Sequence, residues 1–317
     1  VVTSVTGEEI SHQDLGGSDA HSTKSGVAHF VYETEEECMQ GIKRLLDFIP
    51  QNNLENATKK DFSETKSIDE ELRQIVPEKS TEAYDVKEVI NRVIDNQDFL
   101  EVHENFAPNI VVGFGRIKGD TVGIVANQPA SLAGMLDINA SDKAARFVRF
   151  CDAYNIPIIT FVDVPGFMPG VNQEHQGIIR HGAKLIYAYA EATVPKISII
   201  LRKAYGGAYI VMNSKELRSD LNLAWPTAEI AVMGPEGAVN VISRKEISES
   251  KNPEETRNKL IEEYKEKFSS PFLAASRGYI DDVIDPAETR NKIASSLEIF
   301  SKKFLDNPSK KHGNIPL

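Results

Sequence analysis

The sequence is poor in cysteine, and this excludes several classes of protein. Its two cysteines, Cys38 and Cys151, are too few for a disulfide framework and lack the spacing of a zinc site. Cys151 shares an apolar helical face with Ala144, Phe147 and Val148, which predicts a buried core thiol rather than a nucleophile. We therefore expect a reducing compartment, the cytoplasm or, in a eukaryote, the mitochondrial matrix.

Long apolar runs and basic patches are also missing. No run approaches the ~20 residues of a membrane-spanning helix, and no signal peptide is recognisable. The 47 acidic residues outnumber the 36 Lys and Arg, and the net charge of −11 argues against nucleic-acid binding. No Walker A loop is present, no G-x-G-x-x-G opens a helix after a strand, and G-x-S-x-G and H-E-x-x-H are absent. Nucleotide-binding loops, serine hydrolases and zinc sites thus have no support, and we predict no metal.

The first 82 residues are irregular in pattern. Gly, Ser and His dominate "SVTGEEISHQDLGGSDAHSTKSGVAHFVY", which predicts loops around short extended pieces. Thr34 is a predicted N-cap of a helix that ends at Pro50. The helix has one apolar face, formed by Met39, Ile42, Leu45, Leu46 and Ile49. Residues 51–80 are polar and charged, which is typical of a linker.

From about residue 83 strands alternate with helices. Helices are predicted at 84–95, from a Ser141 cap onward, around 177–192, from Gly234-Pro235, at 253–268 and at 286–303. Two strands within 109–128 meet at a turn over Lys118-Gly119-Asp120, and "IPIITFV", "KISIIL" and "AEIAVM" are further strands. Because these strands are apolar on both faces, the sequence predicts an α/β fold with a largely parallel, covered sheet.

Ligands of such folds bind at the carboxyl ends of the strands. Three predicted strands end there in loops that contain glycine, "DVPGFMPG", "RKAYGGA" and "GPEGA". A helix that starts with glycines leaves open N–H groups at the positive end of its dipole, which suits a developing oxyanion. Gly207 and Ala208 are the best placed donors. The alternative is that these glycines only form tight turns.

Side chains near these loops allow more than one interpretation. His175 and His181 flank a helix start and resemble surface or capping groups more than general bases. An aspartate in the position of Asp163 usually fixes a turn by accepting backbone N–H groups. Arg202 and Lys203 could attract a phosphate or carboxylate, or could form a solvated strand end.

Four long blocks of the sequence resemble one family. "GDTVGIVANQP", "ARFVRFCDAYNIPIITFVDVPGFMPG", "QGIIRHGAKLIYAYAEATVPKISIILRKAYGGAYIVM" and "AWPTAEIAVMGPEGAV" look like the carboxyltransferase (beta) subunit of biotin-dependent acyl-CoA carboxylases, nearest the propionyl-CoA carboxylases. The resemblance implies a crotonase/ClpP-like fold of repeated β-β-α units. It implies that residues 1–50 are the tail of an N-terminal carboxyltransferase domain, 51–82 a linker and 83–317 the C-terminal, biotin-side domain.

The resemblance also implies a reaction. Such enzymes transfer a carboxyl group from carboxybiotin to the α-carbon of a short-chain acyl-CoA, for example propionyl-CoA to give methylmalonyl-CoA. The N–H groups of Gly207 and Ala208 would hold the negative charge on the ureido oxygen of biotin, and the biotin anion would take the α-proton. The donor segment for the thioester, of the "SGGAR" type, would lie before residue 1. Pocket candidates are Gly166, Phe167, Tyr205, Gly206 and Tyr209.

One position departs from the family pattern. Propionyl-type enzymes usually have aspartate where this chain has Ile210, two residues past Ala208. The isoleucine could change the wall of the acyl pocket and broaden the chain-length preference, so that acetyl-, propionyl- and butyryl-CoA are all accepted. It could equally be ordinary core packing of the helix.

The resemblance names partners as well. No Met-Lys-Met biotinylation site and no ATP-grasp signature occur, so biotin would arrive on a separate carrier and ATP would act only at a separate biotin carboxylase. Family members form homo-oligomers, hexamers in the full-length form, without nucleic acid or membrane. The alternatives are a subunit of a biotin-dependent methylmalonyl- or malonyl-CoA decarboxylase, which has a membrane partner, or a truncated non-catalytic assembly subunit.

Overall fold

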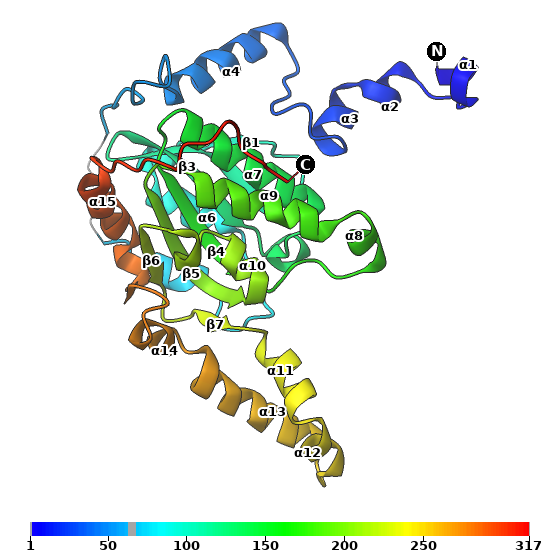
Figure 1. Cartoon of the computed structure of the whole chain (residues 1–317), viewed down its shortest axis with the longest axis vertical. Helices are drawn as coiled ribbons and strands as arrows, with labels where there is room; N and C mark the ends of the chain where they lie inside the picture. Colours follow the sequence, from blue (N-terminus) through cyan, green and yellow to red (C-terminus); the bar gives the residue numbers. More distant parts are fainter. Residues whose placement is uncertain (1, 63–67, 317) are drawn as a thin grey trace.

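The computed structural model describes residues 2–62 and 68–316 and is built around one mixed sheet (Figure 1). Within these residues eight strands run in the spatial order β1-β2-β3-β4-β5-β6-β8, and β7 pairs with β5. β1, β2 and β3 are antiparallel, and every other pairing is parallel, as predicted. The strands are β1 (Leu100–Val102), β2 (Ile110–Ile117), β3 (Asp120–Asn127), β4 (Ile158–Val164), β5 (Lys196–Tyr205), β6 (Leu221–Ala224), β7 (Glu229–Ala231) and β8 (Asp282–Val283).

Helices cover both faces of the sheet. Helices α7 (Ile138–Ala153) and α9 (Ile178–Glu191) pack on one face, and α6 (Val86–Val93) and α15 (Thr289–Phe300) on the other. Successive strand residues alternate between the two cores: Val125 lies with α7 and α9, Ile124 with α6 and α15. Burial on both faces explains why the strands are almost continuously apolar. Cys151 lies in the first core, where burial raises the pKa of its thiol, so the predicted inert core thiol is confirmed.

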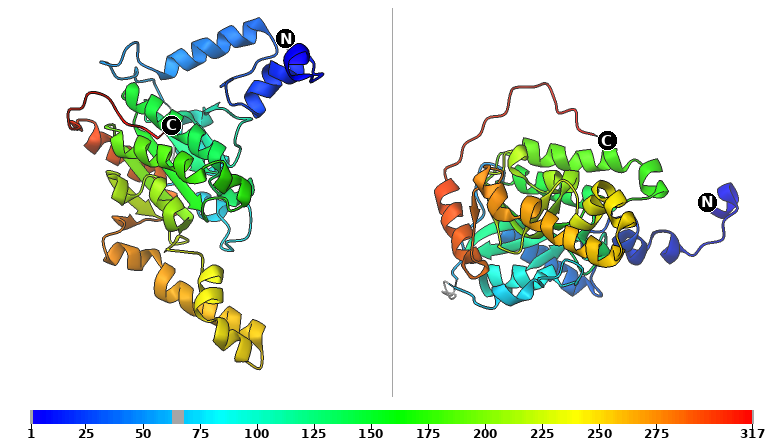
Figure 2. Two further views of the ribbon diagram at one scale, coloured as in Figure 1. Left: turned by 45° about the vertical axis from the view of Figure 1, so that its right-hand side comes forward. Right: turned by 90° about the horizontal axis from the view of Figure 1, so that it is seen from below.

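The remaining helices are shorter or peripheral. Figures 1 and 2 show α1 to α3 extending away from the sheet at one end and α11 to α13 forming an arm at the other. No helix of the described residues has the length and apolar character to cross a membrane. These helices are α1 (Val2–Thr6), α2 (His12–Gly16), α3 (Ser18–Thr23), α4 (Glu35–Phe48), α5 (Leu72–Ile75), α8 (Val171–His175), α10 (Gly206–Val211), α11 (Pro235–Ile242), α12 (Arg244–Glu249), α13 (Pro253–Tyr264) and α14 (Pro271–Ser276). Single turns of other helix types are η1 (Asp95–Gln97), η2 (Leu132–Gly134), η3 (Lys215–Leu217), η4 (Lys265–Ser269) and η5 (Pro286–Glu288).

The prediction for helix α4 is confirmed at both ends. The Thr34 hydroxyl accepts from the Glu37 N–H, and the Glu37 carboxylate accepts from the Thr34 N–H, which is a capping box. The helix ends at Phe48, before Pro50. Its apolar face is only partly covered, because Met39, Ile42 and Leu46 are exposed while Leu45 and Ile49 pack on the first core.

The structure differs from the prediction at the start of helix α7 and in the N-terminal segment. Helix α7 begins at Ile138, because Asp137 and not Ser141 is its N-cap: the Asp137 carboxylate accepts from the Ala140 N–H. Ser141 is buried in the first turn and donates its hydroxyl to the Asp137 carbonyl. Residues 2–23 contain the short helices α1 to α3 joined by loops, rather than loops around extended pieces.

The polar segment 51–80 is not uniformly a solvated chain. Residues 63–67 lie outside the described residues, but the segment after them contains α5, whose Leu72 is fully buried in the second core. The pattern missed α5 because one apolar turn inside a charged stretch gives no periodic signal. The short strands β1, β6 and β8 were missed for the same reason. The division of the chain at residues 50 and 82 stays a prediction.

Two stacked histidines join the N-terminal region to the sheet. The rings of His29 and His103 lie 3.9 Å apart between centroids. His103 Nε2 donates to the Gly26 carbonyl (2.9 Å), and Arg146 Nε donates to His29 Nε2 (3.1 Å), which requires the His29 ring to be neutral. Burial, together with the neighbouring His29, lowers the pKa of His103 to about 4. The contact therefore depends on pH.

We expect the free energy of unfolding to fall as the pH drops from about 6.5, the pKa of an unfolded histidine, to about 4. In that pH range the unfolded chain binds a proton at His103 and the folded chain does not. The resulting loss in the free energy of unfolding that is due to His103 is at most about 3 kcal/mol. Urea unfolding at pH 7 and pH 4.5 measures it. Asparagine tolerates the positive φ of this position (57°) and does not titrate. The free energy of unfolding of His103→Asn should therefore fall less between pH 7 and pH 4.5, by the contribution of His103. An equal loss in both proteins would contradict the assignment.

Candidate functional site

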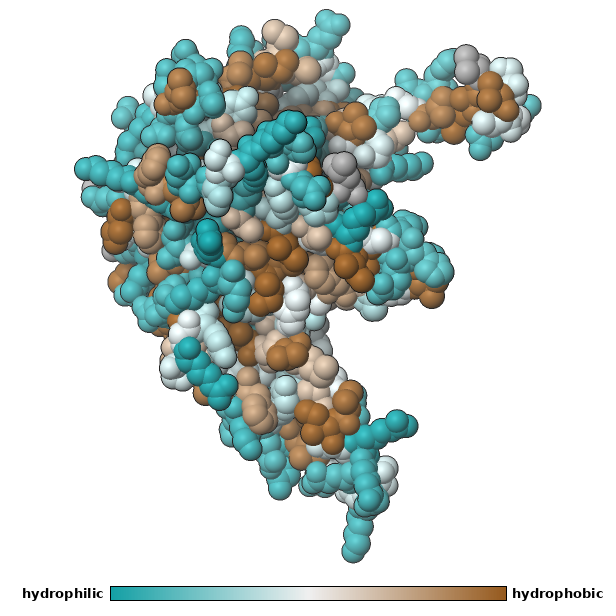
Figure 3. All heavy atoms as spheres, viewed as in Figure 1, coloured by the Kyte–Doolittle hydropathy of each residue, from teal (hydrophilic) through white to brown (hydrophobic). Residues whose placement is uncertain are grey.

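The structure brings the three glycine-containing loops to one edge of the sheet. Strand β7 pairs with the end of β5, so that Tyr205 lies opposite Ala231, and Val164 of β4 lies opposite Ala204. The loops that come after β4, β5 and β7 are therefore neighbours. Figure 3 shows the molecule hollowed between the lobe of α8 and the arm, and α10 lies between these two in Figure 1. Exposed apolar residues lie on α8 (Val171), at the start of α9 (Ile179), after β7 (Val232) and on α11 (Val241 and Ile242).

Helix α10 starts at the end of β5 and offers its first N–H groups. In a helix the first turn has N–H groups without an acceptor inside the helix, and here these are the groups of Gly206, Gly207 and Ala208. Gly207 is exposed, and a Cβ built on it would have nothing within 4 Å. Ala208 is buried, with 1% of its surface exposed. Open space thus adjoins Gly207, while Ala208 is buried, and the role of their N–H groups as oxyanion donors stays a prediction.

Gly206 is held in a conformation that other residues rarely adopt. Its φ is +56°, and a Cβ there would lie 2.7 Å from the Val232 carbonyl oxygen. Because this oxygen belongs to the backbone, a side chain at position 206 could be accommodated only by a shift of the chain at Val232. The first glycine of the pair therefore makes a tight turn, as one interpretation expects, while the role of Gly207 and Ala208 as oxyanion donors stays a prediction.

The remaining pocket candidates lie around these donors, but not all are open. Tyr205 and Tyr209 are buried, at 7% and 6% exposure, and burial raises the pKa of both. The Tyr205 hydroxyl donates to the Glu229 carboxylate. Ile210 is half-buried and packs against the first core, so it contributes to packing whatever else it does.

The loop after β4 is held from both sides. The Gly166 carbonyl accepts from the Leu136 N–H (3.1 Å), and the Met168 N–H donates to the Leu136 carbonyl (2.8 Å). The Phe167 ring lies against Gly182 of α9, where a Cβ would be only 2.9 Å from it. Gly166 and Phe167 therefore have a fixed place at the same edge as α10.

The basic pair at the end of β5 is neither solvated nor free to bind a ligand. Arg202 is 1% exposed and its Nε donates to Asp163 (3.0 Å), which is fully buried. Lys203 is also buried, with its Nζ 3.7 Å from the Asp163 carboxylate. The alternative of a solvated strand end is wrong, and the carboxylate that the pair attracts belongs to the chain itself, to Asp163. Asp163 accepts a backbone N–H group, as predicted, but the donor is Lys203 of β5 (3.2 Å) and not a residue of the turn that follows Asp163.

Sequence reasoning missed that these residues form one unit. The available signal was an acid at the end of one predicted strand and two bases near the end of the next. Ends of neighbouring parallel strands lie side by side, so opposite charges there can pair.

The two histidines of α8 and α9 do not form a catalytic pair. His175 is exposed, and His181 Nδ1 lies 2.9 Å from the Asp142 carboxylate of α7. Lys184 binds the same carboxylate (3.0 Å). His181 thus links two helices. The interpretation that neither histidine is a general base stays a prediction.

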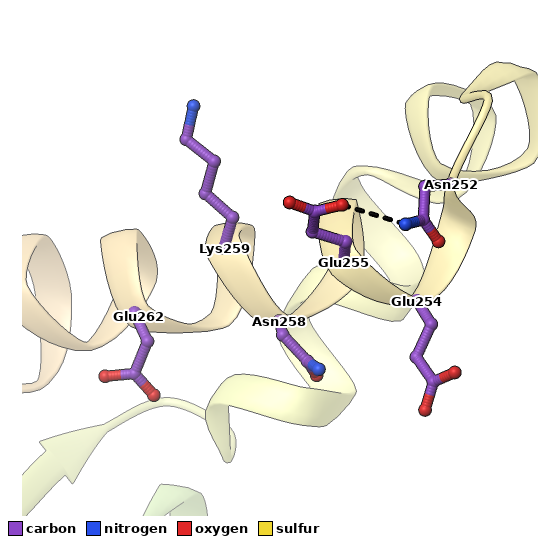
Figure 4. Close-up of a pocket in the computed structure, with 6 residues that line it drawn as sticks. All are labelled: Asn252, Glu254, Glu255, Asn258, Lys259 and Glu262. Atoms are coloured by element: carbon purple, nitrogen blue, oxygen red, sulfur yellow. Dashed lines mark hydrogen bonds between the residues drawn. The ribbon is translucent and has the colours of Figure 1, made fainter.

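Other hollows lie away from the predicted residues. A cavity of about 980 Å³ lies between α4 and the α7/α9 pair, with Leu45, Phe147 and Tyr187 in its wall. Figure 4 shows a hollow along α13 where Asn252 donates to Glu255 (2.8 Å) while the other side chains point apart. The described residues contain no group of His, Cys, Asp and Glu able to hold a metal ion, so this acidic surface is not a metal site. Its lining residues are Asn252, Glu254, Glu255, Asn258, Lys259 and Glu262.

Comparisons with known proteins identify a family for this chain. The family model described as "Carboxyl transferase domain" matches residues 1–315. The chain is 55% identical, over all of its length and 62% of the relative's, to a propionyl-CoA carboxylase carboxyltransferase subunit of Haloferax mediterranei. It is 51% identical, over 100% of its length and 61% of the relative's, to the methylmalonyl-CoA decarboxylase subunit alpha of Veillonella parvula.

A solved structure has the same fold. The transcarboxylase 12S structure, described as a hexamer assembly with methylmalonyl-coenzyme A and methylmalonic acid bound, superposes with a TM-score of 0.95 at 54% identity. It covers all of this chain, and the chain covers 61% of it. The predicted crotonase-type α/β fold is confirmed.

The chain spans about three fifths of the length of these relatives, 62% and 61%. Every residue from 1 to 315 nevertheless falls within the family match. The chain therefore belongs to the carboxyl transferase domain family.

Proposed function

We propose that this chain carries the biotin side of a carboxyltransferase. The enzyme transfers a carboxyl group from carboxybiotin, on a carrier protein, to the α-carbon of a short-chain acyl-CoA such as propionyl-CoA, which gives methylmalonyl-CoA. The observation that carries the proposal is the open first turn of α10, at the end of a buried strand, in a chain 55% identical to a propionyl-CoA carboxylase subunit.

The residues of the chain fit the group that they would hold. The ureido oxygen of biotin is a small, flat acceptor, and Gly207 leaves space above its N–H group that a side chain would fill. When bound, biotin supplies the transferable carboxyl group and accepts negative charge on its ureido oxygen as that group leaves. Gly207 and Ala208 donate to this oxygen, and the donors need no reorganisation because β5 and the strained Gly206 fix them. No side-chain base is needed at this half of the site.

The proposal includes partners and an architecture. Biotin arrives on a carrier subunit and is carboxylated at a separate, ATP-dependent biotin carboxylase. Residues 1–50 are the tail of an N-terminal carboxyltransferase domain, 51–82 a linker and 83–317 the biotin-side domain. The thioester side of the site comes from residues beyond this chain, and the full-length protein assembles as a homohexamer, as the 12S relative is described.

A second function uses the same half of the site. The relative from Veillonella parvula is named a decarboxylase subunit, and transfer in the opposite direction, from acyl-CoA to biotin, needs the same donors. In that case the N–H groups of Gly207 and Ala208 hold the ureido oxygen before the ureido nitrogen attacks. The direction of transfer depends on whether the partner carboxylates biotin or removes the carboxyl group from carboxybiotin. An assay with both kinds of partner therefore distinguishes the two functions.

Fixation of ¹⁴C-bicarbonate into acetyl-, propionyl- and butyryl-CoA tests the proposal. The chain is assayed with a biotin carboxylase and carrier, with and without a supplied N-terminal carboxyltransferase domain of the kind that the proposal implies. We expect avidin-sensitive fixation when that domain is supplied. Absence of fixation in that arm, with release of labelled CO₂ from methylmalonyl-CoA, would favour the decarboxylase; absence of both would contradict a catalytic role.

Ile210 should set the breadth of the substrate range. Ile210→Asp places the residue usual in propionyl-type enzymes at a half-buried position two residues past the donors, and we expect the kcat/KM ratio of propionyl- to butyryl-CoA to rise about tenfold. Competition assays with paired substrates measure the ratio. Ile210→Val, which removes one methylene without charge, is the matched control and should change the ratio far less. An unchanged ratio in Ile210→Asp would assign this residue to core packing alone.

A further inference from the structure

The regular pairing of β4 and β5 is interrupted at Asp163. Val162 lies opposite Ile200, but Val164 lies opposite Ala204, so one residue of β4 faces three residues of β5, 201–203. β5 thus carries two extra residues just before α10. Bulges of this kind bend a strand and re-aim the segment after it, and they are frequent next to active sites.

The Asp163 carboxylate fills the gap in the ladder. Its Oδ1 accepts from the Lys203 N–H (3.2 Å), which would otherwise lack a partner in the bulge, and its Oδ2 accepts from Arg202 Nε (3.0 Å). The Asp163 N–H donates to Asn127 Oδ1 (3.2 Å) at the end of β3. A single buried residue therefore fixes the ends of three strands relative to one another.

Arg202 extends this unit to the segment before α6. Its Nη1 donates to the carbonyls of Lys79 (2.8 Å) and Glu82 (2.9 Å), and its guanidinium lies 5.1 Å from the centroid of the Tyr84 ring. Its Nη2 has no hydrogen-bond partner within the described residues. The segment is thus clamped across the strand ends, next to the loops that carry Gly166 and Gly207.

Stability alone does not explain this ion pair. Removing two charges from water costs several kcal/mol per ion, and a well-packed apolar pair is often as stable or more so. A pair that also leaves one guanidinium nitrogen without a partner among the described residues is a poor way to stabilise a core. The pair does fix the position of both segments that form the site. The loop with Gly166 follows Asp163 in the chain, and Gly207 comes four residues after Lys203, whose N–H group Asp163 accepts.

We propose that Asp163, with Arg202, is a positioning residue for the carboxyl transfer. By holding the bulge of β5 through the Lys203 N–H, it aims the N–H groups of Gly207 and Ala208 at the ureido oxygen. It touches neither substrate nor biotin and takes part in no bond change. The inference rests on the proposed function and adds to it the residues on which the donor geometry depends.

Two charge-free double variants test the inference. Asp163→Asn with Arg202→Met keeps an acceptor for the Lys203 N–H, whereas Asp163→Leu with Arg202→Met removes it. Both variants remove the charges of positions 163 and 202 and leave the Lys203 ammonium with the Ser80 carbonyl as its acceptor (3.2 Å), so that the two differ only in the acceptor at position 163. Because a displacement of ~1 Å can cost about 100-fold in rate, we expect kcat of the Leu/Met variant to fall about 100-fold. The Asn/Met variant should be at least about tenfold faster than Leu/Met, and the KM for acyl-CoA should stay within about twofold in both.

A second buried pair in the same chain is the matched control. Arg290 pairs with Asp95, which also accepts backbone N–H groups, those of Lys118 (3.1 Å) and Gly119 (2.7 Å), but at the β2–β3 turn. Asp95→Leu with Arg290→Met should leave kcat within about twofold of the parent. Its melting temperature should change about as much as that of Asp163→Leu with Arg202→Met. Equal losses of kcat in the two pairs, or a Leu/Met variant at position 163 as active as Asn/Met, would overturn the proposal.

Hydrogen–deuterium exchange gives a readout that needs no turnover. In this chain the amides of residues 203–211 should exchange about tenfold faster in the Asp163 Leu/Met variant, but not in the Asp95 control. Unchanged exchange there would overturn the positioning role even if the parent enzyme fixes bicarbonate. Faster exchange with an inactive parent enzyme would uphold the positioning role and count against the proposed function instead.

Discussion

Gly207→Pro is expected to lower kcat of the carboxyl transfer by about 10²–10³-fold. The substitution deletes one N–H donor from the first turn of α10, and proline is tolerated in the first turn of a helix because that N–H has no acceptor within the helix. Nothing lies within 4 Å of the position that a Cβ would take. The loss should therefore appear in kcat and leave the KM for acyl-CoA and the melting temperature nearly unchanged, as steady-state assays and thermal unfolding would show.

Gly207→Ala is the matched control for this prediction. It adds a Cβ in the same open space but keeps the N–H donor, so its kcat should be at least about tenfold higher than that of Gly207→Pro. If the two variants lose activity equally, the space above Gly207 matters and not its N–H group. If neither loses activity, the α10 start does not hold the oxyanion.

Arg202→Met alone is expected to lower the free energy of unfolding of this chain by about 3–5 kcal/mol, since it leaves the buried Asp163 carboxylate with only the more distant Lys203 ammonium, 3.7 Å away, as a cationic partner. Burial already raises the pKa of Asp163, and Arg202 opposes that effect. Without Arg202 the pKa rises further, and the folded chain then binds a proton that the unfolded chain releases. Stability should therefore fall as the pH rises above about 4, so the loss is larger at pH 8 than at pH 5.

Urea unfolding of the variant at pH 5 and pH 8 measures this effect. Adding Asp163→Leu to Arg202→Met should restore most of the stability and remove the pH dependence that Asp163 causes, because its buried charge is gone. A double variant that is less stable than Arg202→Met would show that the pair stabilises the fold by itself. That result would also weaken the argument that its role is geometric.

The fold could be read from the sequence wherever the pattern was local and periodic. The buried strands were visible as apolar runs, the N-cap at Thr34 as a residue type before an apolar periodic stretch, and the turn at Lys118-Gly119 as residue type. The short strands β1, β6 and β8 could not be read, because two to four residues carry no period and are held only by their neighbours in the sheet. The start of α7 was misplaced because Asp137 and Ser141 are both good capping residues, and only the backbone decides between them.

The candidate site divides in the same way. Residue type and order are local properties, and they suffice to place glycines after three strand ends and to predict that Gly207 and Ala208 open a helix. Two features emerge only when the chain is folded: Gly206 and not Gly207 makes the strained turn, against the Val232 carbonyl, and Arg202 is buried on Asp163 rather than solvated. Both depend on which strand ends become neighbours and on the bulge between β4 and β5. Contacts between residues 39 positions apart in the chain are set by sheet register, which no local pattern encodes.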